Sequence, residues 1–175
     1  MSGRTPGRGV RASALEHFNE LPEDEARLAL LACCASPRWV REVAAGRPYR
    51  DPEQLYRAAD RALADLSDAD LDDALAAHPR IGERRDGDTL SAGEQAGMGG
   101  ADGATRQAVA DGNRRYEDRF GHVYLVAASG RSAEELLADL RRRLDNDPET
   151  ERAVLRAELA KINRIRLAGL VEETR

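Results

Sequence analysis

The 175-residue sequence has few aromatic residues (4%) and only two cysteines. The cysteines, Cys33 and Cys34, are neighbours, and adjacent cysteines rarely bridge each other. The chain is therefore not a disulfide framework, and a reducing cytoplasm is its natural setting. The three histidines are scattered singly, and no cysteine or histidine pair has the spacing of metal ligands. We therefore expect no metal site.

Long apolar runs and a net positive charge are also missing. No window approaches the roughly 20 apolar residues of a membrane helix, and the net charge of −5 argues against nucleic-acid binding. The basic N-terminal stretch "MSGRTPGRGVR" has no apolar segment behind it, so we expect a disordered tail over residues 1–12 rather than a signal peptide. The C-terminal "EETR" is not a peroxisomal address of the S-K-L type. We expect a cytoplasmic protein that binds neither nucleic acid nor membrane.

Clear helix-start signals are present instead. Ser36, Asp51 and Asp147 each precede a proline, which pairs an N-cap residue with proline at the first helical position. Ser67 and Ser132 can cap two further helices. These signals and the apolar periodicity predict helices over 22–34, 37–45, 52–66, 67–77, 104–119, 132–144 and 148–172.

The stretch "HVYLVAA" at 122–128 is the only strand-like run. A lone strand has no partner, so we expect either buried extended chain or part of a helix. The length suits one domain with its own core. We therefore predict an all-α, single-domain bundle of about seven to eight helices over residues 13–175.

The region 82–103 differs from the rest because it holds seven of the 15 glycines. It is either a mobile linker or a loop whose backbone approaches a ligand closely, and composition alone favours the linker. Within it, Ser91 and Glu94 have the spacing of a capping box, which explains both residues structurally. Gln95 is not explained in this way. A glutamate beside a glutamine offers acceptors and donors suited to an amide- or urea-like ligand.

His78 stands directly before Pro79, and proline disfavours helical geometry in the residue that precedes it. The helix from about 68 should therefore end here, with the imidazole at its C-terminus, where exposed carbonyls favour the protonated form. A structural role, in which the imidazole only complements the helix dipole, is favoured for such a histidine taken alone.

Arg166 interrupts an apolar stripe on the last predicted helix. At 100° per residue, the stripe is formed by Leu155, Leu159, Ile162 and Leu170, and Arg166 falls in its middle. A guanidinium that faces a core needs an anion or several acceptors. Snorkelling near the chain end is the alternative, and both interpretations stay open. Arg164 points to the opposite face and is expected to be solvated.

Eight stretches follow one another in the order found in a known enzyme family. The combination of H-P-R-I-G, S-x-x-E-Q and N-x-x-Y-x-x-x-F-G is specific, and the stretches span nearly the whole chain. They are "FNELP" (18–22), "CASPRW" (34–39), "RPY" (47–49), "AHPRIGE" (77–83), "SAGEQAGM" (91–98), "NRRYEDRFG" (113–121), "GRSAEELLADLRRRL" (130–144) and "ELAKINRIRL" (158–167). The chain resembles the 2-oxo-4-hydroxy-4-carboxy-5-ureidoimidazoline (OHCU) decarboxylase family of urate degradation.

The resemblance implies an all-helical homodimer that uses no cofactor. It implies decarboxylation of OHCU to (S)-allantoin and carbon dioxide, with urate oxidase and hydroxyisourate hydrolase as pathway neighbours. In the family's pattern the catalytic residues correspond to His78, Glu94 and Arg166. The residues implied in substrate binding are Pro79, Ser91, Glu94, Gln95 and, through backbone groups, Val126, Ala127, Ala128, Ser129 and Gly130. Ser91 and Glu94 would then cap and bind at once.

Two positions depart from the family's pattern. Many relatives have an aromatic residue after F-G, where this chain has His122, and an arginine in the next stretch, where it has Ser129. If that arginine contributes to binding elsewhere, this site holds its substrate differently. Two alternatives to OHCU decarboxylation are a decarboxylase of a related ureido or hydantoin acid and a non-catalytic helical binding protein on the same fold.

Overall fold

The computed structural model describes residues 13–83 and 96–172, and within these ranges it contains helices and no strands. The prediction of an all-α fold is confirmed, and the described residues form eight α-helices and one 3-10 helix. They are α1 (Ala14–Glu20), α2 (Glu23–Cys33), α3 (Pro37–Ala45), α4 (Pro52–Ala64), α5 (Asp68–Ala76), η1 (Ala96–Met98), α7 (Gly103–Phe120), α8 (Ala133–Arg143) and α9 (Pro148–Val171). The expected tail over 1–12 lies outside the described residues.

The predicted N-caps hold in the structure. In α3, α4, α5, α8 and α9, the side chain of the capping residue accepts a hydrogen bond from a backbone N–H in the first turn; these residues are Ser36, Asp51, Ser67, Ser132 and Asp147. The expectations did not include α1. Ser13 caps it and forms a capping box with Glu16, so the S-x-x-E signal was present there as well.

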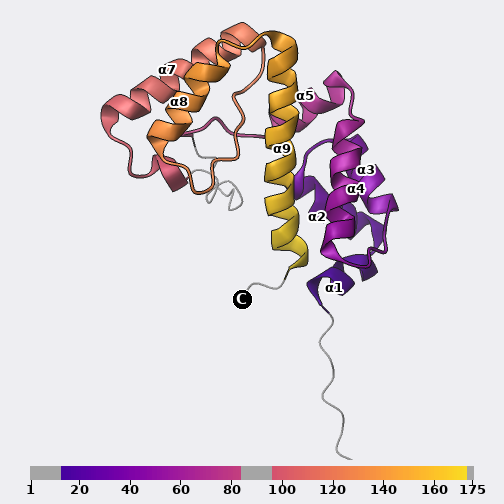
Figure 1. The fold of residues 1–175 in the computed structure, drawn as a ribbon. Helices are drawn as coiled ribbons and strands as arrows, with labels where there is room; N and C mark the ends of the chain where they lie inside the picture. The colour runs from indigo at the N-terminus through magenta and orange to yellow at the C-terminus, as the bar shows by residue number, and fades with distance from the viewer. Residues whose placement is uncertain (1–12, 84–95, 173–175) are drawn as a thin grey trace, which may run out of the picture.

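Helix α9 stands between two groups of helices (Figure 1). On one side α1–α5 pack with α9 around a core that includes Trp39, Leu55 and Leu159. On the other side α7 and α8 form a hairpin with a second core around Val109, Leu136 and Leu140. None of the helices in the described ranges is both long and apolar enough to cross a membrane.

Residues 123–128 run between these two cores and form neither helix nor strand, so the helical interpretation is wrong. Leu125 belongs to the first core, with Val123 and Ala127 packed against it. Tyr124, Val126 and Ala128 belong to the second core. Because side chains alternate along extended chain, a single segment fills both cores and joins them.

A buried ion pair anchors this segment to α8 and α9. Arg143 is fully buried, and its Nη2 lies 2.5 Å from Oε1 of the equally buried Glu151. Its Nη1 donates to the backbone oxygen of Leu125 at 2.7 Å. The guanidinium carbon also lies 4.8 Å from the ring centroid of Tyr124. The positive charge is therefore matched by a carboxylate, a carbonyl and an aromatic face, as a buried cation requires.

Candidate functional site

His78 lies just beyond the end of α5, as its position before Pro79 predicted. The helix ends at Ala76, with Ala77 as C-cap, and the backbone N–H of His78 donates to the oxygen of Leu75 at 2.9 Å. The residue is only 4% exposed. The side chain is thus buried at the helix end, which is not the position of a histidine that only complements the dipole from the surface.

The chain after His78 is fastened to α7. The guanidinium of Arg80 donates to both carboxylate oxygens of Glu117, at 2.5 and 2.8 Å, and this arginine lowers the pKa of the Glu117 carboxyl. Asn113 donates through Nδ2 to the backbone oxygen of Ile81 at 3.0 Å. These contacts fix the backbone that follows the histidine, and so help to fix the histidine itself.

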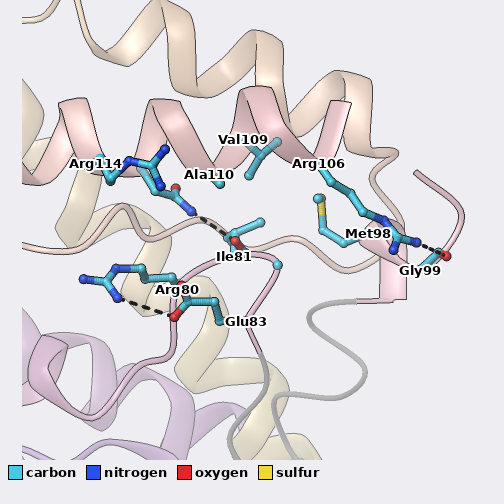
Figure 2. A pocket seen from close by; sticks show the side chains of 11 residues that line it. Arg80, Ile81, Glu83, Met98, Gly99, Arg106, Val109, Ala110 and Arg114 are labelled. Carbon is cyan, nitrogen blue, oxygen red and sulfur yellow. Dashed lines mark hydrogen bonds and ion pairs between the residues drawn. The ribbon is translucent and has the colours of Figure 1, made fainter. Parts of the chain in front are cut away.

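A cavity of about 540 Å³ lies between this segment and α7. In Figure 2 the side chains of Val109, Met98 and Ile81 are directed toward it from α7, η1 and the 80–83 segment, and Arg106 and Arg114 stand on α7 beside it. None of its described lining residues is one of the predicted site residues.

The segment 122–130 is held along one edge by two helices. The backbone N–H of Ala127 donates to Oε2 of Glu158 at 2.8 Å, while Arg143 binds the oxygen of Leu125. Groups two residues apart in extended chain point to the same side, so the N–H and C=O of Val126 point the opposite way. Within the described residues these two groups make no hydrogen bond, although Val126 is buried.

The end of this segment meets the glycine-rich region. Gly130 has a φ of +76°, in a turn where Arg131 donates to the oxygen of Ala128 at 3.0 Å. A Cβ on Gly97 would lie 2.0 Å from the oxygen of Arg131. The backbone at Gly97 therefore approaches this turn closely, while the choice between a mobile linker and a loop that approaches a ligand stays a prediction. Ser91, Glu94 and Gln95 lie outside the described residues.

Arg166 occupies the position on α9 that the stripe predicted. Leu155, Leu159 and Ile162 are buried, and Arg166 is partly buried beside them. Its Nη1 donates to the backbone oxygen of Cys33 at 3.3 Å. Burial raises the pKa of the Cys33 thiol to about 12, although Arg166 acts to lower it. The thiol therefore stays protonated near neutral pH and is no nucleophile.

The expectation that Arg164 is a solvated charge is confirmed, since 41% of its side chain is exposed. Its Nη2 donates to Oδ2 of Asp60 on α4 at 2.6 Å, and its guanidinium carbon lies 5.6 Å from the ring centroid of Tyr56. Arg164 thus forms a surface ion pair with α4.

Residues next to three of the predicted parts belong to one core. Leu75, Leu125 and Ile162 lie close in sequence to His78, Val126 and Arg166, and their side chains share one cluster, whereas Val126 itself packs in the other core. Among the described residues, no group of three or more histidine, cysteine or acidic side chains could hold a metal ion. The described residues offer a buried imidazole, a guanidinium and the unpaired N–H and C=O groups of Val126, and their assembly into one site stays a prediction.

Two supporting residues were missed by the sequence reasoning. Arg143 ends a run of three arginines at the C-terminus of α8, where basic residues ordinarily complement the helix dipole. Glu158 has a lysine three residues later, which makes it look like half of a surface ion pair. In both cases the decisive partner is a backbone group of the 122–130 segment, and no spacing rule predicts such a contact.

Comparison with known proteins gives a family. The family model described as OHCU decarboxylase matches residues 19–168. The 2-oxo-4-hydroxy-4-carboxy-5-ureidoimidazoline decarboxylase of Haloferax volcanii is 29% identical over 157 residues, which cover 88% of this chain and 94% of the relative. The uric acid degradation bifunctional protein TTL of Arabidopsis thaliana is 29% identical over 161 residues, which cover 88% of this chain and 48% of the relative. This chain thus spans about half of that longer protein.

A solved structure supports the fold. The crystal structure of OHCU decarboxylase in the presence of (S)-allantoin matches with a TM-score of 0.73 at 24% identity, over 86% of this chain and 98% of the other. Because the identity is low, the likeness supports the all-helical arrangement alone. The family model, by contrast, covers most of the sequence, as the eight motifs predicted. The chain belongs to the OHCU decarboxylase family.

Proposed function

We propose that the chain decarboxylates OHCU to (S)-allantoin and carbon dioxide in urate degradation, without a cofactor. The observation that carries this proposal is the match of the family model to residues 19–168. The name of the Haloferax relative, which this chain covers almost entirely, supports the same substrate. A homodimer, a cytoplasmic location and pathway neighbours that oxidise urate and hydrolyse hydroxyisourate complete the proposal.

The reaction needs positioning and one proton donor. The carbon–carboxylate bond of OHCU breaks, carbon dioxide leaves, and the electron pair stays on the ring carbon, where it conjugates into the neighbouring ring system. A proton must then reach one face of that carbon. Oriented binding, donors toward developing charge and a single acid–base group are enough for these steps. His78 is our candidate for the acid–base group because imidazole titrates near neutrality.

The other groups would hold the ring and the ureido arm. Glu94 and Gln95 offer an acceptor and an amide for ring and ureido N–H groups, and Ser91 adds a hydroxyl. Pro79 would line the site beside the imidazole. Backbone donors and acceptors would come from the N–H and C=O of Val126 and from the backbone of Ala127, Ala128, Ser129 and Gly130. In this arrangement most of the binding energy is directed at the ring system rather than at the leaving carboxylate.

Arg166 has a distinct role in this scheme. A tight ion pair with the leaving carboxylate would stabilise the ground state and slow the reaction. We therefore assign its guanidinium to a ring carbonyl or to the oxyanion that develops as carbon dioxide leaves. The guanidinium already donates to a neutral carbonyl oxygen, that of Cys33, which supports a carbonyl oxygen as its partner in the ligand. A ligand complex with the guanidinium forked onto the carboxylate alone would contradict this assignment.

The test of the proposal is a coupled assay with urate, urate oxidase and hydroxyisourate hydrolase, followed by ultraviolet absorbance and circular dichroism. We expect the wild-type protein to accelerate the loss of OHCU and to yield predominantly (S)-allantoin, because a proton delivered inside the site reaches one face of the carbon. An unchanged decay would contradict the activity. Racemic allantoin from an active protein would contradict protonation inside the site.

A second prediction concerns Glu158, which fixes the backbone at Ala127. Glu158→Met should raise KM and lower kcat/KM for OHCU by about 10-fold, because one tenfold step corresponds to about 1.4 kcal/mol, the scale of one hydrogen bond to a charged group. Glu158→Gln should keep near wild-type kinetics, since its amide oxygen can still accept from Ala127. Steady-state kinetics of both variants test the positioning role.

A matched control separates this effect from lost stability. Glu16→Met removes a capping-box glutamate from α1 and so weakens the start of that helix, yet it should leave KM and kcat unchanged. The positioning role is wrong if Glu158→Met and Glu16→Met behave alike in the assay.

A further inference from the structure

Asn163 on α9 is a buried amide without a strong hydrogen-bond partner among the described residues. The residue is 2% exposed, and within the described part of the chain neither its Oδ1 nor its Nδ2 makes a hydrogen bond. An asparagine amide offers two donors and an acceptor. Leaving such a buried group poorly satisfied destabilises the folded state, so the side chain is unfavourable for the fold in this state.

The surroundings of Asn163 are polar and close to Arg166. Burial raises the pKa of the Cys34 thiol, while hydrogen bonding by the Ser36 backbone and by the Asn163 side chain and the charge of Arg166 act to lower it. The amide and the guanidinium therefore both lie near this thiol. Arg166 also donates to the backbone oxygen of Cys33. The thiol is only a weak partner, and its contact does not satisfy the amide. Asn163 and Arg166 thus form one polar cluster at the C-terminal end of α2.

Another buried asparagine shows what a structural role looks like in this chain. Asn113 is 3% exposed, and its Nδ2 donates to the backbone oxygen of Ile81 at 3.0 Å. Its Oδ1 has no partner among the described residues, but the bond from Nδ2 joins α7 to the chain after His78 and explains why the side chain is polar. Asn163 has no comparable contact among the described residues, so folding alone does not account for its amide.

We propose that Asn163 is a substrate-binding residue whose amide pairs with a ureido or cyclic-amide edge of the ligand held beside Arg166. This inference rests on the proposed function. Residues three apart on a helix are neighbours on one face, so a ligand that engages Arg166 lies within reach of Asn163. Nδ2 donates to a ureido carbonyl and Oδ1 accepts from a ureido N–H, which is the complementarity that an otherwise unsatisfied amide lacks.

The experiment compares Asn163→Leu with wild type. Leucine is similar in size, has no polar atoms and is the better helix former, so the melting temperature of the ligand-free variant should be equal or higher. Its kcat/KM for OHCU should fall by about 10-fold or more, on the scale of one lost hydrogen bond to the ligand. The shift in melting temperature caused by allantoin, a ureido probe that needs no turnover, should shrink in parallel.

Asn113→Leu is the matched control because it gains the same helix propensity but removes a donor from Ile81. Its melting temperature should fall. A lower melting temperature for Asn163→Leu would overturn the inference, and so would unchanged kinetics together with an unchanged allantoin shift. If wild type fails to convert OHCU, the proposed function fails. The inference then survives only if allantoin stabilises wild type and not Asn163→Leu, and an absent shift in wild type overturns it as well.

Discussion

Replacing His78 with asparagine is expected to lower kcat for OHCU by roughly 10²–10⁴-fold, the usual contribution of a positioned acid–base group. Asparagine is chosen because His78 is only 4% exposed. At such a buried position, alanine would leave a cavity. Asparagine keeps a polar side chain of moderate size but cannot transfer a proton at neutral pH. The measurement is kcat from the coupled assay, with far-ultraviolet circular dichroism to show that the helices remain.

The same variant has a stereochemical consequence. If His78 delivers the proton, the allantoin that His78→Asn still produces should have a lower enantiomeric excess, because its proton comes from solvent and not from inside the site. His17→Asn is the control, since His17 is an exposed histidine on α1 and should change neither rate nor product. Near wild-type kcat in His78→Asn would remove this residue from the proton transfer.

Arg143→Met is expected to lower the free energy of unfolding by about 3–5 kcal/mol, the usual cost of removing one partner of a buried ion pair. The change leaves Glu151, which is fully buried, without its cation. It also removes the donor that binds the oxygen of Leu125 at 2.7 Å. Urea denaturation followed by circular dichroism measures the loss.

Two further variants identify the cause. Arg141→Met makes the same change of charge on an exposed face of α8, where surface substitutions usually stay within about ±0.5 kcal/mol. The double variant Arg143→Met with Glu151→Met should be more stable than the single one, because no unpaired charge remains. A double variant less stable than Arg143→Met would show that the unpaired carboxylate is not the source of the effect.

Most of the helices were predictable because their signals are local. The N-cap and proline pairs at Ser36, Asp51 and Asp147 each act within a single turn, so they can be recognised without knowledge of the fold. The conformation of 122–128 was left open between two possibilities for the opposite reason. The alternation of its side chains cannot be recognised in the sequence because the residues on both faces are apolar. Only the structure shows that the two faces pack into two separate cores.

The residues of the candidate site also divide into those with a local signal in the sequence and those without one. His78 could be placed from its position before Pro79 and from the family motifs, and Arg166 from the interrupted stripe. Glu158 and Asn163 could not be found in this way, because one depends on a distant backbone N–H and the other on the lack of any partner among the described residues. The roles of Ser91, Glu94 and Gln95 remain predictions.

The extended segment between the two cores ties the site to cooperative folding. Tyr124 and Leu125 are neighbours in the chain, yet they pack in different cores, so neither the α7–α8 hairpin nor the α1–α5 group can open without releasing this strand of backbone. Local unfolding of a protein ordinarily leaves other regions folded. Here any opening that separates the two cores also frees Val126, so the proposed binding edge depends on both cores being folded together.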